Sequence, residues 1–208
     1  MDIIKQIYNK EYYNNKNILI TGGTGTLGNI LTDFFLNETS ITKVCIFSRD
    51  EFKQHNMKLK YKNHKNYENL RFFIGDIRDA ERIKYACKDI DIVFHTAALK
   101  QVDAIEYNPM EAIKTNIIGT QNVIMACIDN NVDQLIGIST DKCVAPANLY
   151  GATKLCLEKL IISAYEYSAY KLKTCVLRYG NVVGSRGSVV PIFLNQKDKG
   201  EFTVTDRR

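Results

Sequence analysis

Five side chains within a short stretch of the sequence have the types and spacing needed for proton transfer. Thr140, Asp141 and Lys142 follow one apolar run, and Tyr150 and Lys154 lie in the helical pattern that comes next. Tyr150 and Lys154 are four residues apart, so they share one face of a helix. An ammonium group beside a phenol lowers its pKa from about 10, which makes a tyrosine usable as a base near neutrality. All five are therefore candidate catalytic residues.

Each part of this pattern also has a plainer interpretation. A Tyr and a Lys at this spacing are common on a solvated helix face, and Asp141 with Lys142 could form an exposed pair worth under about 1 kcal/mol. The catalytic hypothesis gains weight from position, because Thr140 ends a strand where open α/β folds bind ligands.

A glycine-rich loop supplies a second candidate site. Gly22, Gly25 and Gly28 follow an apolar run at 17–20 and precede a helical pattern. In such a loop the first glycine permits a tight turn, the second admits a pyrophosphate and the third lets the helix pack closely on the strand. The helix N-terminus would then face an anion. An ordinary glycine turn is the alternative, but the surrounding strand and helix favour a dinucleotide, contacted also by Thr24, Thr26 and Leu27.

The cofactor is expected to be NADP, with NAD possible. Ser48 and Arg49 end the second strand about 20 residues beyond the glycines, where this fold contacts the ribose. Arg49 could pair with a 2′-phosphate, whereas Asp50 could take ribose hydroxyls or cap the next helix. Four further residues at strand ends are expected near the cofactor: Asp76, Ile77, Ala97 and Ala98.

The elements that must position these residues alternate along the chain. Apolar runs typical of buried parallel strands occur at 17–20, 43–47, 70–74, 90–95, 134–139 and 174–178. Helical patterns occur at 25–36, 79–87, 109–130 and 149–171, and residues 51–69 could form a surface helix or a loop. A shorter helix is expected at 190–199 and a strand at 202–205. This order predicts a doubly wound α/β fold with a parallel sheet. We place a cofactor-binding domain at 1–180 and the start of a substrate lobe at 181–208.

Composition narrows the class of protein further. The formal net charge of +5 is mild and its cations are scattered, so nucleic acid is not an expected partner. No apolar run approaches the roughly 20 residues that span a bilayer. Six cysteines without CxxC spacing predict reduced thiols and a cytoplasmic protein. His95 has no partner at ligand spacing, so no metal site is expected.

Several segments of the sequence resemble a known family, the extended short-chain dehydrogenases. Within that family, FSRDEFKQ, GDIRD, HTAALKQVDAIEYNP, KTNIIGTQNV, STDKCVAPANLYGATK and RYGNVVGSRGSVVP are similar to the inverting UDP-N-acetylglucosamine 4,6-dehydratases of bacterial flagellin-glycan and capsule pathways. The resemblance runs from Asn17 onward. Membrane-anchored retaining relatives carry Met where this chain has Tyr150.

The resemblance implies a division of labour among the catalytic candidates. Tyr150 would take the proton of the sugar 4-hydroxyl while NADP accepts the hydride, giving a 4-keto sugar. Lys142 would remove the acidified carbon-5 proton, Asp141 would protonate the departing 6-hydroxyl, and Thr140 would polarise the ketone. Return of the hydride to carbon 6 and reprotonation of carbon 5 from the other face would complete an inverting dehydration.

The same resemblance implies weaker assignments and leaves alternatives open. Lys100 would lie near the nicotinamide and the sugar, and Asn116 would support the cofactor side of the site. Tyr179, Asn181 and Arg186 would contact substrate, although surface roles are nearly as well supported. Helices 109–130 and 149–171 would form a homo-oligomer. Relatives continue beyond the chain's end at Arg208, so we expect an incomplete substrate lobe, from truncation or as a short natural form. A nucleotide-sugar 4-epimerase and a silent NADP-binding module stay as alternatives.

Overall fold

A six-stranded parallel sheet forms the centre of the computed structural model, which describes residues 9–183, 189–197 and 200–203. The strand order is that of dinucleotide-binding folds. Strands β1 to β3 are added toward one edge of the sheet and β4 to β6 toward the other, so the order of addition reverses between β1 and β4. From one edge to the other the strands are β3 (Leu70–Ile74), β2 (Lys43–Ser48), β1 (Asn17–Thr21), β4 (Ile92–His95), β5 (Gln134–Ile138) and β6 (Lys173–Leu177). The predicted fold class is confirmed.

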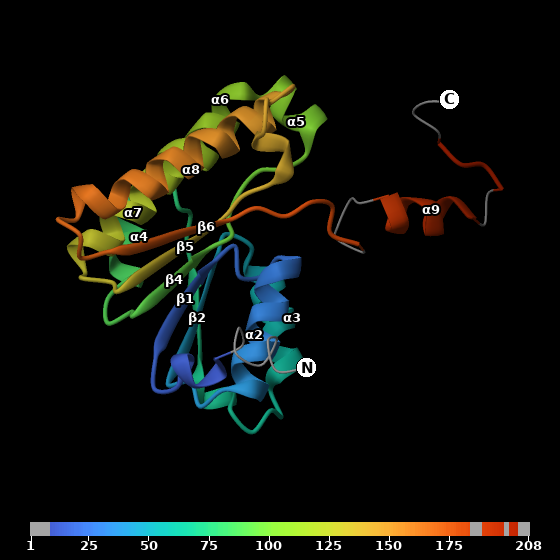
Figure 1. The fold of residues 1–208 in the computed structure, drawn as a ribbon. Helices are drawn as coiled ribbons and strands as arrows, with labels where there is room; N and C mark the ends of the chain where they lie inside the picture. The colour runs from blue at the N-terminus through green and yellow to red at the C-terminus, as the bar shows by residue number, and fades with distance from the viewer. Residues whose placement is uncertain (1–8, 184–188, 198–199, 204–208) are drawn as a thin grey trace.

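Helices cover both faces of the sheet because successive residues of the central strands point to opposite sides (Figure 1). Ile18 and Ile20 pack with α2 (Thr26–Glu38) and α3 (Glu51–Tyr61), whereas Leu19 packs with helices of the other face. Those helices are α4 (Ala80–Ala86), α7 (Gly119–Asp129) and α8 (Leu149–Tyr167). Both faces of β1 and β2 are therefore buried, which is why these strands are continuously apolar.

Some elements differ from the sequence prediction. The helix expected at 109–130 consists of α6 (Pro109–Ala112), a π-helical turn η3 (Ile113–Ile118) and α7, with Pro109 at the first helical position. A short helix α5 (Val102–Tyr107) was not expected. Residues 51–69, left open above, form α3 and the 3-10 turn η2 (Tyr67–Asn69).

The remaining elements lie near the two ends of the chain and beside β5. The first is the 3-10 turn η1 (Lys10–Tyr13), and the 3-10 turn η4 (Asp141–Cys143) follows β5. The predicted C-terminal helix is α9 (Val189–Lys197), which buries none of its residues. The strand prediction at 202–205 is wrong for Phe202 and Thr203, which lie in irregular chain; the other two residues are outside the described part. The proposed domain boundary at 180 stays a prediction.

Two further observations concern the chemistry of the chain as a whole. All six cysteines are free thiols, and four of them are buried. Among the described helices, none is long and apolar enough to cross a membrane.

The glycine loop after β1 has the geometry that its spacing predicts at its first and third positions. Gly22 has φ +67°, a left-handed conformation that favours glycine. A Cβ on Gly28 would lie 2.3 Å from the carbonyl oxygen of Gly23, so α2 could not approach the loop this closely with a larger residue. At Gly25 the nearest atom to such a Cβ is Gly22 O, at 3.1 Å.

These contacts predict different effects for two matched substitutions. Gly28→Ala should destabilise the free protein by about 1–3 kcal/mol, because α2 must move away from the loop. Gly25→Ala should change the free energy of unfolding much less. Urea denaturation of both variants tests this, and equal losses of stability would contradict the close-packing role of Gly28.

Candidate functional site

The candidate residues meet at the carboxyl edge of the sheet because all six strands run in the same direction. The glycine loop follows β1, the Thr96–Lys100 loop follows β4, and the turn with Asp141 and Lys142 follows β5. Residues separated by more than a hundred positions in the sequence are thereby brought to one edge of the structure (Figure 1).

The loop after β1 exposes backbone at the start of α2. Thr24 and Leu27 are half-buried, Gly25 and Thr26 are exposed, and Gly25 occupies the N-cap position. Among the described residues, no side chain caps the helix by a hydrogen bond. The first backbone N–H groups of α2 are thus available to an anion, and the helix dipole favours negative charge there.

The residues after β2 have separate roles. Asp50 is the N-cap of α3, where its carboxylate accepts a hydrogen bond from the Lys53 backbone nitrogen at 3.0 Å. Ser48 is buried, and its hydroxyl accepts a hydrogen bond from Gln54 Nε2 at 3.0 Å. Arg49 is exposed, with its guanidinium 3.6 Å from Asp76. Of the two possibilities considered for Asp50, the structure shows the helix cap.

Three of the other expected cofactor residues line the same edge with different degrees of exposure. The Asp76 carboxylate is only partly exposed and accepts hydrogen bonds from Arg78. Burial alone would raise the pKa of Asp76, but these bonds and the two arginine charges leave it below its usual value. Ile77 is buried, and its side chain packs against Gly119, so only its backbone can face a ligand. Ala97 is half-buried beside Gly22.

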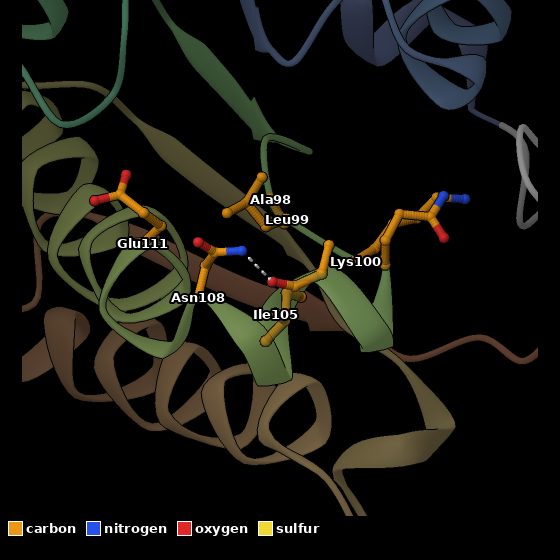
Figure 2. A pocket seen from close by; sticks show the side chains of 8 residues that line it. Ala98, Leu99, Lys100, Ile105, Asn108 and Glu111 are labelled. Carbon is orange, nitrogen blue, oxygen red and sulfur yellow. Dashed lines mark hydrogen bonds between the residues drawn. The ribbon is translucent and has the colours of Figure 1, made fainter.

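The loop after β4 borders a cavity of about 340 Å³ (Figure 2). Ala98, Leu99 and Lys100 contribute to its wall from the loop, and Ile105 and Asn108 contribute from α5 and the residue after it. Lys100 is exposed at this point. The wall is mostly apolar, and Lys100 and Glu111 are its charged lining residues.

The turn η4 holds three of the catalytic candidates in contact with one another. The Thr140 hydroxyl donates to Asp141 Oδ1 at 2.9 Å, and Lys142 Nζ donates to the same oxygen at 3.1 Å. The bond from Lys142, followed by that from Thr140, keeps the pKa of the Asp141 carboxyl below its usual value. Lys142 Nζ also donates to Asn181 Oδ1 at 2.8 Å. Asp141 is therefore a carboxylate in the free protein.

Tyr150 and Lys154 share one end of α8, but their chemistry differs from the sequence prediction. Burial raises the pKa of Tyr150 above its usual value, while the Thr140 hydroxyl acts in the opposite direction. Lys154 is buried and donates to the carbonyl oxygen of Ile138 at 2.7 Å, and burial lowers the pKa of Lys154 to about 8. The prediction that Lys154 lowers the pKa of Tyr150 is wrong for the free protein, because burial of the phenol, reinforced by the nearby Asp141 charge, outweighs the hydrogen bond with Thr140.

The segment after β6 closes one side of η4. The Tyr179 carbonyl accepts a hydrogen bond from the Asp141 backbone nitrogen at 3.1 Å, and Asn181 contacts Lys142 as described. The structure thus brings both residues to the turn η4. Arg186 lies outside the described residues.

Gly151, next to Tyr150, was overlooked in the sequence. A Cβ at this position would lie 2.1 Å from the carbonyl oxygen of Lys142, so only glycine lets η4 rest against the start of α8. The signal was present in the sequence, since a glycine in the first turn of a helix usually has a packing reason.

A buried hydrogen-bond chain around His95 was also missed. Thr120 Oγ1 donates its only proton to Asn116 O at 2.7 Å, so His95 Nε2 must be the donor to Thr120 at 2.9 Å. His95 Nδ1 then accepts from Thr21 Oγ1 at 2.8 Å, which fixes a neutral ring in one tautomer. This series of hydrogen bonds links the end of β1, just before the glycine loop, to the π-helical turn.

Asn116 continues this hydrogen-bond chain toward α8. Its fully buried amide donates to Leu99 O and to Thr153 Oγ1, and its oxygen accepts from Leu99 N. The side chain therefore holds the loop after β4 against α8, and its polar atoms are occupied by protein groups.

Burial of His95 predicts an acid sensitivity that one substitution should remove. Burial, and then the nearby Lys154 charge, lower the pKa of His95 to about 3. Since the unfolded ring takes up a proton below about pH 6.5, stability is full above that pH and falls as the pH drops toward 3, by at most about 1.4 kcal/mol per unit.

Urea denaturation between pH 7 and pH 4 should show a shallower pH dependence for His95→Gln than for the unchanged protein. His55→Gln, which alters an exposed side chain of α3, is the matched control and should keep the original slope. The same slope in His95→Gln as in the unchanged protein would argue against a neutral buried ring.

Comparison with known proteins agrees with the fold and with the resemblance in the sequence. Residues 18–208 match the family model described as polysaccharide biosynthesis protein. The chain is 51% identical over 199 residues to an inverting UDP-N-acetylglucosamine 4,6-dehydratase of Campylobacter jejuni (strain 81-176), covering 94% of this chain and 58% of the relative. It is 47% identical over 197 residues to a UDP-glucose 4-epimerase of Rickettsia rickettsii, covering 92% and 57%.

A solved structure has the same fold and a related sequence. The X-ray structure of Pen from Bacillus thuringiensis superposes with a TM-score of 0.88 at 45% identity, covering 94% of this chain and 59% of that one. The chain thus spans somewhat more than half the length of the relatives it matches. With a family model matched over 191 residues, 18–208, this chain belongs to the polysaccharide biosynthesis protein family.

Proposed function

We propose that this chain carries the cofactor site and catalytic residues of an NADP-dependent UDP-N-acetylglucosamine 4,6-dehydratase. The observation that carries the proposal is the convergence of the glycine loop, Thr140, Asp141, Lys142 and Tyr150 on one sheet edge. The relative from Campylobacter jejuni bears this activity in its name and shares half of its aligned residues with the chain.

The glycine loop fits a dinucleotide. Gly22 makes the turn, Gly25 is exposed at the N-cap position and the first N–H groups of α2 are uncapped, which is the donor set that a pyrophosphate needs. Backbone of Ile77, Ala97 and Ala98 would border the rest of the molecule. The cofactor would supply acceptance and return of a hydride, and the positive charge of its oxidised ring would favour ionisation of Tyr150.

NADP is favoured over NAD by two cations. Arg49 is exposed after β2, and Lys53 lines a recess of about 250 Å³ together with Thr24 and Asn29. Lys53 was not identified from the sequence, although it lies in the same segment. The Asp50 carboxylate pairs with Lys53 at 2.7 Å and caps α3, and these contacts would compete with hydrogen bonds to ribose hydroxyls.

The protein's own groups would handle the protons. Tyr150 would take the proton of the 4-hydroxyl, with Thr140 beside it to polarise the resulting ketone. Lys142 would remove the acidified proton from carbon 5. Asp141 starts as a carboxylate bonded to Lys142, so acid catalysis by Asp141 requires that substrate binding separate this pair and leave a proton on the carboxyl group.

Two other activities compete with this proposal. The similarity to Rickettsia proteins named UDP-glucose 4-epimerase favours epimerisation at carbon 4, which would leave the 6-hydroxyl intact. A silent NADP-binding module would bind the cofactor and form no product. Asp141 and Lys142 support dehydration, because epimerisation at carbon 4 does not require removal of the carbon-5 proton.

A homo-oligomer in the cytoplasm completes the proposal. Apolar side chains are exposed along the segment from α6 to α7, at Met110, Ile118 and Met125, and on α8 at Ile162. Both of these helical segments therefore have apolar side chains available for a partner. The six free thiols support a reducing compartment.

Incubation of the chain with UDP-N-acetylglucosamine and NADP, followed by mass spectrometry, tests the activity. We expect a product that has lost one water, without net formation of NADPH. Tyr150→Phe should lower kcat by about 10²-fold or more, because it removes the base. Tyr167→Phe, at an exposed position of α8, is the matched control and should retain full activity. A carbon-4 epimer would favour the epimerase, and cofactor binding without product would favour the silent module.

Titration calorimetry with both dinucleotides tests the choice of cofactor. Arg49→Gln and Lys53→Gln should each weaken NADP binding by about tenfold and leave NAD affinity nearly unchanged, since only the 2′-phosphate loses a charged partner. Lys58→Gln, an exposed change on α3, should affect neither. Tighter binding of NAD than of NADP by the unchanged protein would overturn the assignment.

A further inference from the structure

A buried carboxylate lies behind the catalytic turn and has no part in the mechanism above. Glu158 is on α8, one turn after Lys154, and its side chain is only 5% exposed. Arg178 Nε and Nη2 donate to its two oxygens at 2.7 and 2.6 Å, which is a bidentate pair. Cys143 Sγ lies 3.0 Å from Glu158 Oε1 and 2.9 Å from Thr140 O.

These contacts join three elements that come from separate parts of the sequence. Glu158 belongs to the catalytic helix, Cys143 is the last residue of η4, and Arg178 follows β6 directly. Arg178 precedes Tyr179, whose carbonyl binds the Asp141 nitrogen. The turn is therefore fixed on one side by Glu158 and on the other by the segment that Arg178 begins.

We propose that Glu158 is a positioning residue, which holds the turn Asp141–Cys143 against the catalytic helix and couples it through Arg178 to the segment 179–181. The inference rests on the proposed function, because it concerns how that site is held. Glu158 itself touches no reacting group; it acts through Cys143 and Arg178.

The energetics favour a strong constraint. Arg178 holds the pKa of Glu158 at about 2, so the group is a carboxylate at any physiological pH. Loss of Arg178, which is itself half-exposed, would leave the buried Glu158 carboxylate without its charged partner and so destabilise it. The Glu158 charge also favours the protonated form of Lys154, against the effect of burial. One carboxylate thus stabilises both the turn and the lysine beside Tyr150.

Cys143 provides a direct reporter of this arrangement. Its thiol is 2% exposed, and burial and then the bond to Glu158 raise its pKa, so alkylation should be slow. Cys87 and Cys127 are fully buried far from the turn and report on the opening of the whole domain. Peptide-resolved mass spectrometry measures all three alkylation rates in one sample.

The test compares Arg178→Met and Glu158→Gln with the conservative variant Arg178→Lys. In Arg178→Met, Cys143 alkylation should rise on the order of tenfold while Cys87 and Cys127 stay protected, because opening is local. Turnover should fall by about tenfold or more with NADP affinity within about twofold, since displacement of the turn affects chemistry and spares the glycine loop. Arg178→Lys, which keeps the charge without the bidentate geometry, should be intermediate.

Glu158→Gln keeps the shape of the side chain and removes its charge, so it carries the test should Arg178→Met fail to fold. Lys84→Met is the control for loss of a cation, because Lys84 is as exposed as Arg178 (50%) but its partner Asp129 is 37% exposed, and this variant should resemble the unchanged protein. Cys143 alkylation rates that stay low in both Arg178→Met and Glu158→Gln would overturn the inference. So would a joint rise at all three cysteines, or NADP affinity that falls in step with kcat. Should the unchanged protein lack turnover, the proposed function fails while the alkylation rates still decide this inference.

Discussion

The hydrogen bond from the buried ammonium of Lys154 to the backbone of β5 is the interaction on which the geometry of the site depends. A cation out of contact with water needs a fixed partner, and the carbonyl of Ile138 at the end of β5 provides it at 2.7 Å. This bond sets the first turns of α8 against the strand end that leads into Thr140. The turn η4 can then rest on α8 because residue 151 is glycine. Placement of Tyr150 beside Thr140 follows from these two contacts.

Electrostatics around this lysine explain how the edge of the sheet tolerates so many polar groups. His95 is neutral, and both of its ring nitrogens form hydrogen bonds with threonines. The Asn116 amide forms hydrogen bonds with Leu99 and Thr153. Glu158 supplies the one buried negative charge near Lys154 among the described residues and is itself held by Arg178. The buried polar groups of His95, Asn116 and Lys154 are thus satisfied by protein atoms, whereas Asp141 and Lys142 stay exposed.

Much of the fold could be predicted from the sequence because its strands are buried on both faces and its loop glycines are regularly spaced. The six strands of the sheet are confirmed, and the structure brings Thr140, Asp141, Lys142, Tyr150 and Lys154 to one edge of it. The sequence could not show which polar side chains are buried, and burial changes their pKa values. The pKa of Tyr150 is raised because desolvation depends on tertiary packing, and spacing alone says nothing of it. Likewise Glu158 and Arg178 are twenty positions apart, and only the return of β6 beside β5 brings them together.

Similar identity to proteins named as dehydratases and as epimerases means that fold alone does not select the reaction. The central claim is that hydride leaves carbon 4 of the sugar and returns to carbon 6. Incubation with UDP-N-acetylglucosamine deuterated at carbon 4, followed by NMR of the product, tests it most directly. The account predicts deuterium at carbon 6 of a 4-keto, 6-deoxy sugar. Deuterium retained at carbon 4 of an epimer, or lost to solvent, would contradict it.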